Sequence, residues 1–60
     1  MILRGSVLIV DDEIGPRESL RMILKPFFDV FMASSGKAAL EIIQKESIDV
    51  ATVDLRMPGM

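Results

Sequence analysis

Three aspartates follow apolar runs of the sequence and have the chemistry to hold a metal ion together. Asp11 and Asp12 come directly after the run Val7–Val10, and Asp54 comes directly after the largely apolar run Val50–Val53. If these runs form neighbouring parallel strands, their carboxyl ends share one edge of a sheet, and the three carboxylates converge there. Crowded carboxylates are costly unless a cation or protons offset their charge. Because the chain has no histidine or cysteine, such oxygen ligands favour a hard ion such as Mg²⁺.

A plainer interpretation exists for these acids and for other polar residues near them. An aspartate at the end of a strand often forms a turn or caps a helix, and Asp11 and Asp12 taken alone fit that role as well as metal binding. Glu13 fits a solvated acid in a first helical turn, and the pair Ser34–Ser35 fits helix caps better than nucleophiles. The double acid combined with Asp54 on one set of strands is far more specific than any one of these residues.

Three segments predict the strands that would position the acids. Val7–Val10 is apolar throughout and Val50–Val53 nearly so, and both are rich in β-branched residues. This pattern is typical of strands buried on both faces of a parallel sheet. The segment Asp29–Ala33 predicts a short strand between them.

Two helices are predicted in the intervals between these strands. In the first, apolar residues recur at helical spacing at Leu20, Ile23, Leu24 and Phe27. Pro26 lacks an N–H and clashes with the preceding turn, so this helix is expected to end near Lys25 or to bend there. The second helix is predicted over residues 37–46, capped by a serine of the preceding turn, with apolar side chains on one side at Leu40 and Ile43. The order βαβαβ with short connections implies an α/β fold with a parallel sheet and right-handed crossovers.

Size and composition limit the chain to one small domain. A domain of 60 residues buries only about 60% of the surface that its unfolded chain exposes, so it is marginally stable alone. Disulfides are excluded, which leaves an oxygen-bound metal or a partner chain as support.

Half of the residues are hydrophobic and the mean hydropathy is +0.41, yet no apolar run approaches the length of a membrane span. The net charge of −2 without a basic cluster argues against direct nucleic acid binding. We expect a cytoplasmic protein that does not enter a membrane.

With these elements in place, the sequence resembles the response-regulator receiver domains of two-component signalling. The matching stretches are "VLIVDDE", "SSGKAALEII" and "DVATVDLRMPGM". The resemblance implies a signalling phosphoacceptor rather than an enzyme. By this resemblance, Asp54 takes a phosphoryl group from a phosphohistidine of a sensor histidine kinase. It also implies Mg²⁺ bound by Asp12 directly, by Asp11 often through water, by Asp54, and by the backbone carbonyl of Arg56. The implied fold is flavodoxin-like, with a three-stranded parallel sheet in the order 2-1-3 and helices on both faces.

The resemblance also implies that residues 1–60 are the N-terminal half of a receiver domain. The family's domain is about twice this length, a usual size for one domain. Its second half carries two strands, three helices, and the hydroxyl residue and lysine that contact the phosphoryl group. Lys25, Lys37 and Lys45 do not match that lysine. We therefore expect the truncated chain to be inactive as a switch.

Two other functions are considered beside the phosphoacceptor, and the first is compatible with it because it describes this chain rather than its parent protein. One is a self-associating fragment without phosphotransfer activity, a homodimer or higher oligomer joined along Val50–Val53, either by edge pairing or by strand exchange. An exposed apolar strand edge templates pairing with another chain. The other is a flavodoxin-like binder of a nucleotide or flavin. Phosphate-binding loops need small residues whose N–H groups cradle phosphate, and the acidic "DDEIGP" after the first strand would repel it.

Overall fold

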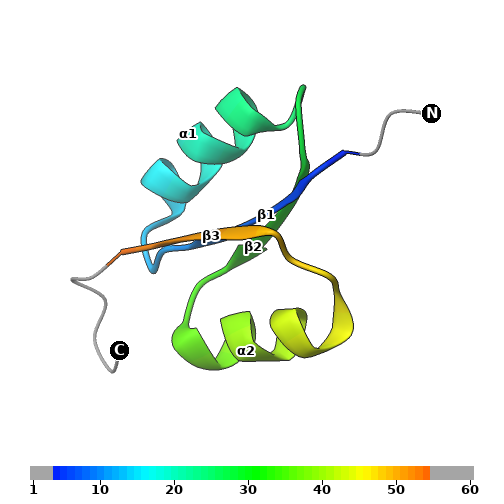
Figure 1. Ribbon diagram of the computed structural model, residues 1–60. Coiled ribbons are helices and arrows are strands. Elements are labelled where there is room, and N and C mark those ends of the chain that lie inside the picture. The colour runs from blue at the N-terminus through cyan, green and yellow to red at the C-terminus, as the bar shows by residue number, and fades with distance from the viewer. Residues whose placement is uncertain (1–3, 55–60) are drawn as a thin grey trace.

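The strands form a parallel sheet, and the two helices that alternate with them along the chain cover its two faces, one on each (Figure 1). A computed structural model describes residues 4–54. Within them the elements are β1 (Ser6–Val10), α1 (Ile14–Leu24), β2 (Asp29–Ala33), α2 (Gly36–Lys45) and β3 (Val50–Val53). The strand order is β2-β1-β3, and β1 pairs in parallel with both neighbours. The predicted βαβαβ order and the 2-1-3 sheet are confirmed.

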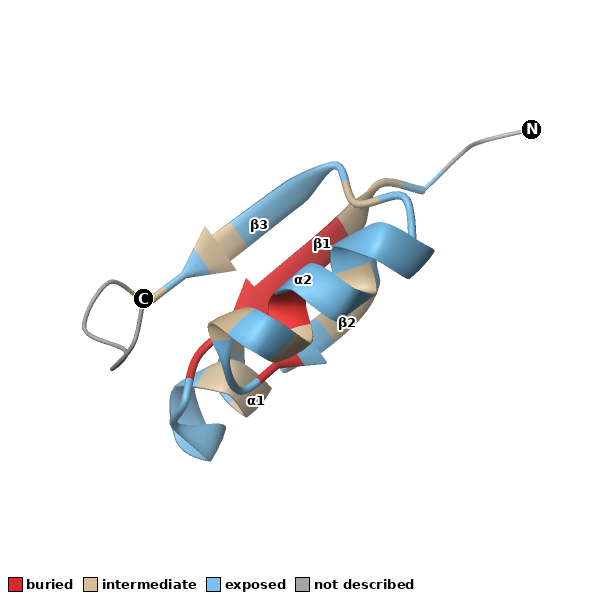
Figure 2. Ribbon diagram, turned by 90° about the horizontal axis from the view of Figure 1, so that it is seen from below, coloured by how far each residue is buried: buried red, intermediate tan, exposed pale blue. Residues whose placement is uncertain are grey.

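The central strand explains why the first apolar run has no polar alternation. β1 lies between two strands and under a helix on each face, so Val7 to Val10 are all buried and Leu8 is 0% exposed. In contrast, β3 lies at an edge of the sheet and is mostly exposed, with Val50 at 57% (Figure 2). Within residues 4–54, both helices pack against β1 and β2, and neither packs against β3. The two similar runs therefore have opposite environments.

The core under α2 differs from the sequence prediction in which side of the helix it uses. Leu8, Val10 and Ala33 form this core with Ala39, the one residue of α2 that is buried. Ala38 and Ile42 pack beside it. The predicted apolar side at Leu40 and Ile43 lies towards β3 and stays exposed instead, with Leu40 at 61%. The reason is that α2 lies over β1 and β2, so the side of the helix towards β3 has no partner in the described residues.

The boundaries of both helices follow the local signals. α1 ends at Leu24 with Lys25 as its C-cap, directly before the proline at position 26. On α2, the Ser35 hydroxyl oxygen accepts the N–H of Ala38 at 3.1 Å, which is the predicted serine cap. α1 buries no residue completely, and Ile23 of its predicted apolar stripe is exposed. No helix among residues 4–54 is long and apolar enough to cross a membrane.

Polar contacts fasten the amino-terminal ends of the strands. The Arg4 side chain donates to the carbonyl oxygens of Lys25, at 2.8 Å, and of Phe28. It also forms an ion pair with Asp29 at 3.4 Å. On the other side of the sheet, the Asp49 carboxylate accepts the N–H of Ser6 at 2.8 Å. These contacts connect the ends of β1, β2 and β3 that lie opposite the acidic edge.

Candidate metal centre

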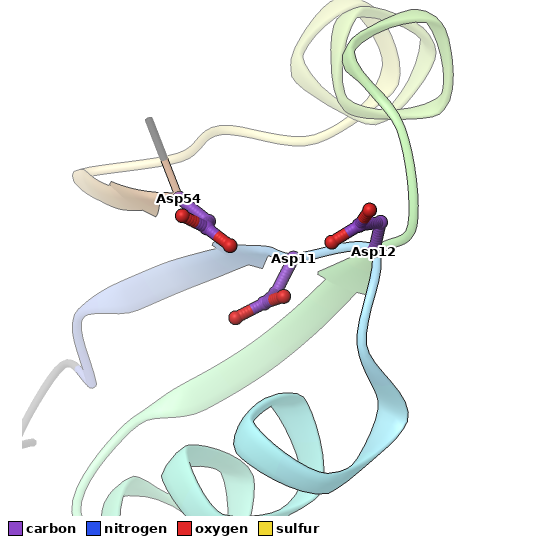
Figure 3. Close-up of side chains that lie close together, drawn as sticks. All are labelled: Asp11, Asp12 and Asp54. Atoms are coloured by element: carbon purple, nitrogen blue, oxygen red, sulfur yellow. The ribbon is translucent and has the colours of Figure 1, made fainter. Parts of the chain in front are cut away.

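The carboxyl ends of β1 and β3 bring Asp11, Asp12 and Asp54 together. Val10 is aligned with Ala33 on β2 and with Val53 on β3, so the three strands end level with one another. Each aspartate offers one carboxylate oxygen, and these three oxygens lie within 4.8 Å of one another (Figure 3). The predicted convergence of the three carboxylates is therefore present.

Asp11 is fixed by hydrogen bonds at three of its groups. Its N–H donates to the Ala33 carbonyl oxygen at 3.1 Å. Its Oδ1 accepts the N–H of Glu13 at 2.9 Å, which is the aspartate turn of the plainer interpretation. Its carbonyl oxygen accepts Nη1 of Arg17 at 3.0 Å. Asp11 is only 8% exposed, and a carboxylate has several acceptor positions, so forming this turn does not prevent it from facing a cation.

The other two aspartates are reachable from solvent. Asp12 follows Asp11 in the connection between β1 and α1 and is exposed. Asp54 is half-buried, and its N–H donates to the Val10 carbonyl oxygen at 3.0 Å. This bond extends the pairing of β3 with β1 by one residue and places Asp54 beside the end of β1. Within the cluster, the Asp12 carboxylate is exposed, and those of Asp11 and Asp54 are half-buried.

The chemistry of this donor set fits a hard divalent cation. Two unit charges about 4 Å apart repel by about 4 kcal/mol at an effective dielectric constant of about 20. Three ionised carboxylates within 4.8 Å therefore gain from a cation between them. The cluster is made of oxygen donors alone, which Mg²⁺ prefers. The predicted ligand Arg56 and the Met-Pro-Gly turn after it lie outside the described residues.

Glu13 and Ser35 match the plainer interpretation, and sequence reasoning missed one residue at the site. Glu13 precedes α1 and is exposed, and Ser35 is the cap of α2. Sequence reasoning did not single out Arg17, which donates to the main chain of Asp11. Its position could have indicated a contact, because a cation near the amino terminus of a helix is unfavourable with the helix dipole unless another interaction stabilises it.

The comparisons with known proteins identify the family of this chain. Residues 7–60 match the family described as response regulator receiver domain. Over 60 residues, 98% of this chain, it is 37% identical to sporulation initiation phosphotransferase F of Bacillus subtilis. It is 41% identical to regulatory protein VanR of Enterococcus faecium over 95% of this chain. It is 33% identical to hydrogenase transcriptional regulatory protein HoxA of Bradyrhizobium diazoefficiens over 97%. No solved structure matches the chain significantly.

The chain belongs to the response regulator receiver domain family, because the family match covers far more than half of it. Its class is that of two-component signalling proteins, and this favours the receiver interpretation over a nucleotide or flavin binder. The chain spans 48% of the length of phosphotransferase F, 25% of VanR and 12% of HoxA.

Proposed function

We propose that Asp54 accepts a phosphoryl group from a sensor histidine kinase, with Mg²⁺ held by Asp11, Asp12 and Asp54. The observation that carries this proposal is the convergence of the three carboxylates within 4.8 Å in a member of the receiver family. The name of the Bacillus relative, a phosphotransferase, supports phosphoryl chemistry. The backbone carbonyl of Arg56 is proposed as a further ligand.

The transfer is a displacement at phosphorus. A carboxylate oxygen of Asp54 attacks the phosphorus of a phosphohistidine, the P–N bond breaks, and its electron pair returns to the imidazole ring. The product is an acyl phosphate on Asp54. When bound, Mg²⁺ supplies positive charge that offsets the phosphoryl oxygens at an edge that is otherwise negative. Asp11 and Asp12 take part by holding that charge in place.

Removing one carboxylate should separate a specific metal site from a merely acidic surface. Asp12→Asn is expected to weaken Mg²⁺ binding by about tenfold or more, because affinity for hard cations follows the number of charged oxygen ligands. The measurement is a Mg²⁺ titration followed by amide chemical shifts in NMR spectra, which detects weak binding.

Glu13→Gln is the matched control for this titration. It removes the same charge one residue away, from a side chain that is exposed and outside the cluster. Affinity is expected to stay within about twofold, because exposed charges are screened by solvent and salt. Equal losses in both variants would contradict a defined site. Phosphorylation by acetyl phosphate that continues undiminished in excess chelator would contradict the role of the metal.

We also propose that the chain is a signalling phosphoacceptor rather than an enzyme, and that residues 1–60 are the N-terminal half of a receiver domain. Support comes from the extent of the match, which covers 98% of this chain but 48% of phosphotransferase F. The hydroxyl residue and lysine implied by the family resemblance have no matching position among these residues. On this proposal residues 1–60 carry the phosphoacceptor but not the switch.

We further propose that the 60-residue chain forms a homodimer along β3. Within residues 4–54, β3 pairs only with β1, so its outer edge presents main-chain N–H and C=O groups. Beside this edge lies a groove of about 630 Å³ between α2 and β3. Its lining is mainly apolar and includes Leu40, Ile43 and Val53.

A two-fold axis perpendicular to the sheet would pair β3 with its copy in antiparallel orientation and bring the two grooves together. It would also place the two Asp54 residues towards opposite ends of the joined sheet, and strand exchange is the rival geometry.

A charge at the centre of β3 is expected to dissociate this dimer. Ala51→Glu places two like charges next to the two-fold axis, which should raise the dimer dissociation constant by at least about tenfold. Sedimentation velocity at micromolar concentrations measures it. Met22→Glu is the control, because Met22 is an exposed apolar residue on α1, which does not contact β3. A folded wild-type chain that remains strictly monomeric would contradict the proposal.

A further inference from the structure

We propose that Arg17 is a positioning residue for the acidic cluster, fixing Asp11 and through it Asp12 in the geometry that receives Mg²⁺. This role rests on the proposed function of the site. Arg17 lies on α1 and is half-buried, and its Nη1 donates to the carbonyl oxygen of Asp11 at 3.0 Å. It also lines a small hollow with residues at the end of β2, Met32, Ala33 and Ser34.

The contact matters because, within residues 4–54, Asp12 is held only through its neighbours. Residues 11–13 connect β1 to α1, and Asp12 is the middle one. On one side the Glu13 N–H donates to Asp11 Oδ1 at 2.9 Å, and the Glu13 carbonyl oxygen accepts the N–H of Arg17 at 3.4 Å. On the other side the Asp11 N–H is bound to the end of β2. Arg17 is the only side chain among residues 4–54 with a hydrogen bond to the Asp11 carbonyl, so it ties the helix to this connection.

The placement of Arg17 has a cost that this contact offsets. A cation near the amino terminus of a helix lies at the positive end of the helix dipole, which is unfavourable. A charge-assisted hydrogen bond to a carbonyl oxygen is stronger than a neutral one. Partners that orient metal ligands in this way change metal affinity although they do not touch the metal.

Charge and positioning make opposite predictions for removal of Arg17, which allows a decisive test. A nearby positive charge repels Mg²⁺, so a purely electrostatic role predicts tighter Mg²⁺ binding in Arg17→Met. A positioning role predicts weaker binding, by about tenfold as for other groups that orient metal ligands. Arg17→Lys keeps the charge and a donor group but loses the planar guanidinium, and its Mg²⁺ affinity is expected to lie between those of Arg17→Met and the wild type.

The experiment is a Mg²⁺ titration of the folded chain by NMR, with amide hydrogen exchange measured before the metal is added. The Glu13 amide is expected to exchange faster in Arg17→Met than in the wild type, since its partner Asp11 is less fixed. Arg21→Met is the control, because Arg21 lies one turn further along α1 and pairs with Glu18 at 3.0 Å. Both its Mg²⁺ affinity and its Glu13 exchange are expected to match the wild type.

The outcomes separate this role from the proposed function. If Asp12→Asn binds Mg²⁺ as the wild type does, the metal site itself is wrong, and the role of Arg17 falls with it. If Asp12→Asn loses affinity while Arg17→Met binds as tightly as the wild type or tighter, the site stands and the positioning role is overturned. If Arg17→Met does not fold, Arg17→Gln and Arg17→Lys carry the same comparison, and wild-type affinity in both overturns the role.

Discussion

Replacing Asp54 by asparagine is expected to abolish phosphorylation of the intact receiver domain. The amide keeps the shape of the side chain but removes the carboxylate nucleophile and one negative charge from the cluster within 4.8 Å. After incubation with acetyl phosphate or the sensor kinase in the presence of Mg²⁺, the wild type should gain a phosphoryl group that hydroxylamine removes, as it does from acyl phosphates. The variant should show only background labelling by mass spectrometry.

Asp49→Asn is the matched control for this experiment. Asp49 precedes β3 at the opposite end of the strand, and its carboxylate accepts the N–H of Ser6 at 2.8 Å. An asparagine oxygen can accept the same bond, so the fold should be kept and labelling should be unchanged. Undiminished labelling of Asp54→Asn, or an acyl phosphate mapped to another aspartate, would overturn the assignment of Asp54.

Truncating Leu8 should have the largest effect on folding. Leu8 is 0% exposed in the middle of the central strand, and Leu→Ala changes in cores cost about 2–5 kcal/mol. At about 0.05–0.15 kcal/mol per residue, a chain of 60 residues has about 3–9 kcal/mol of stability in all. We therefore expect Leu8→Ala to be largely unfolded or to melt at a much lower temperature, as measured by circular dichroism.

The same substitution at Leu40 tests whether burial is the cause. Leu40 lies on α2 and is 61% exposed, and alanine is a strong helix former. Leu40→Ala should therefore change the free energy of unfolding by about 0.5 kcal/mol or less, when measured at a concentration low enough to keep the chain monomeric. A loss at Leu40 as large as that at Leu8 would contradict the exposure of this side of α2.

The connection after β1 shows how far local sequence can predict a site. Two acids after one strand and one acid after another could be assigned to the same edge, because parallel strands end on the same side of a sheet. The contact between Arg17 and the Asp11 carbonyl could not be assigned in this way. It depends on how α1 leaves the sheet, and only the packed structure fixes that path.

By itself the sequence determined the elements and their order: the strands from β-branched apolar runs, the end of α1 from Pro26, and the start of α2 from the Ser35 cap. These are short-range properties, because a backbone preference or a cap acts within a few residues. Only the tertiary structure decided that Ala39 rather than Leu40 enters the core, and that β1 is buried while β3 is exposed. The hydropathy of a side chain indicates how much free energy is gained when it is buried. Whether it is buried depends on segments far away in the chain that lie against it, and the strand order β2-β1-β3, with both helices over β1 and β2, sets those neighbours.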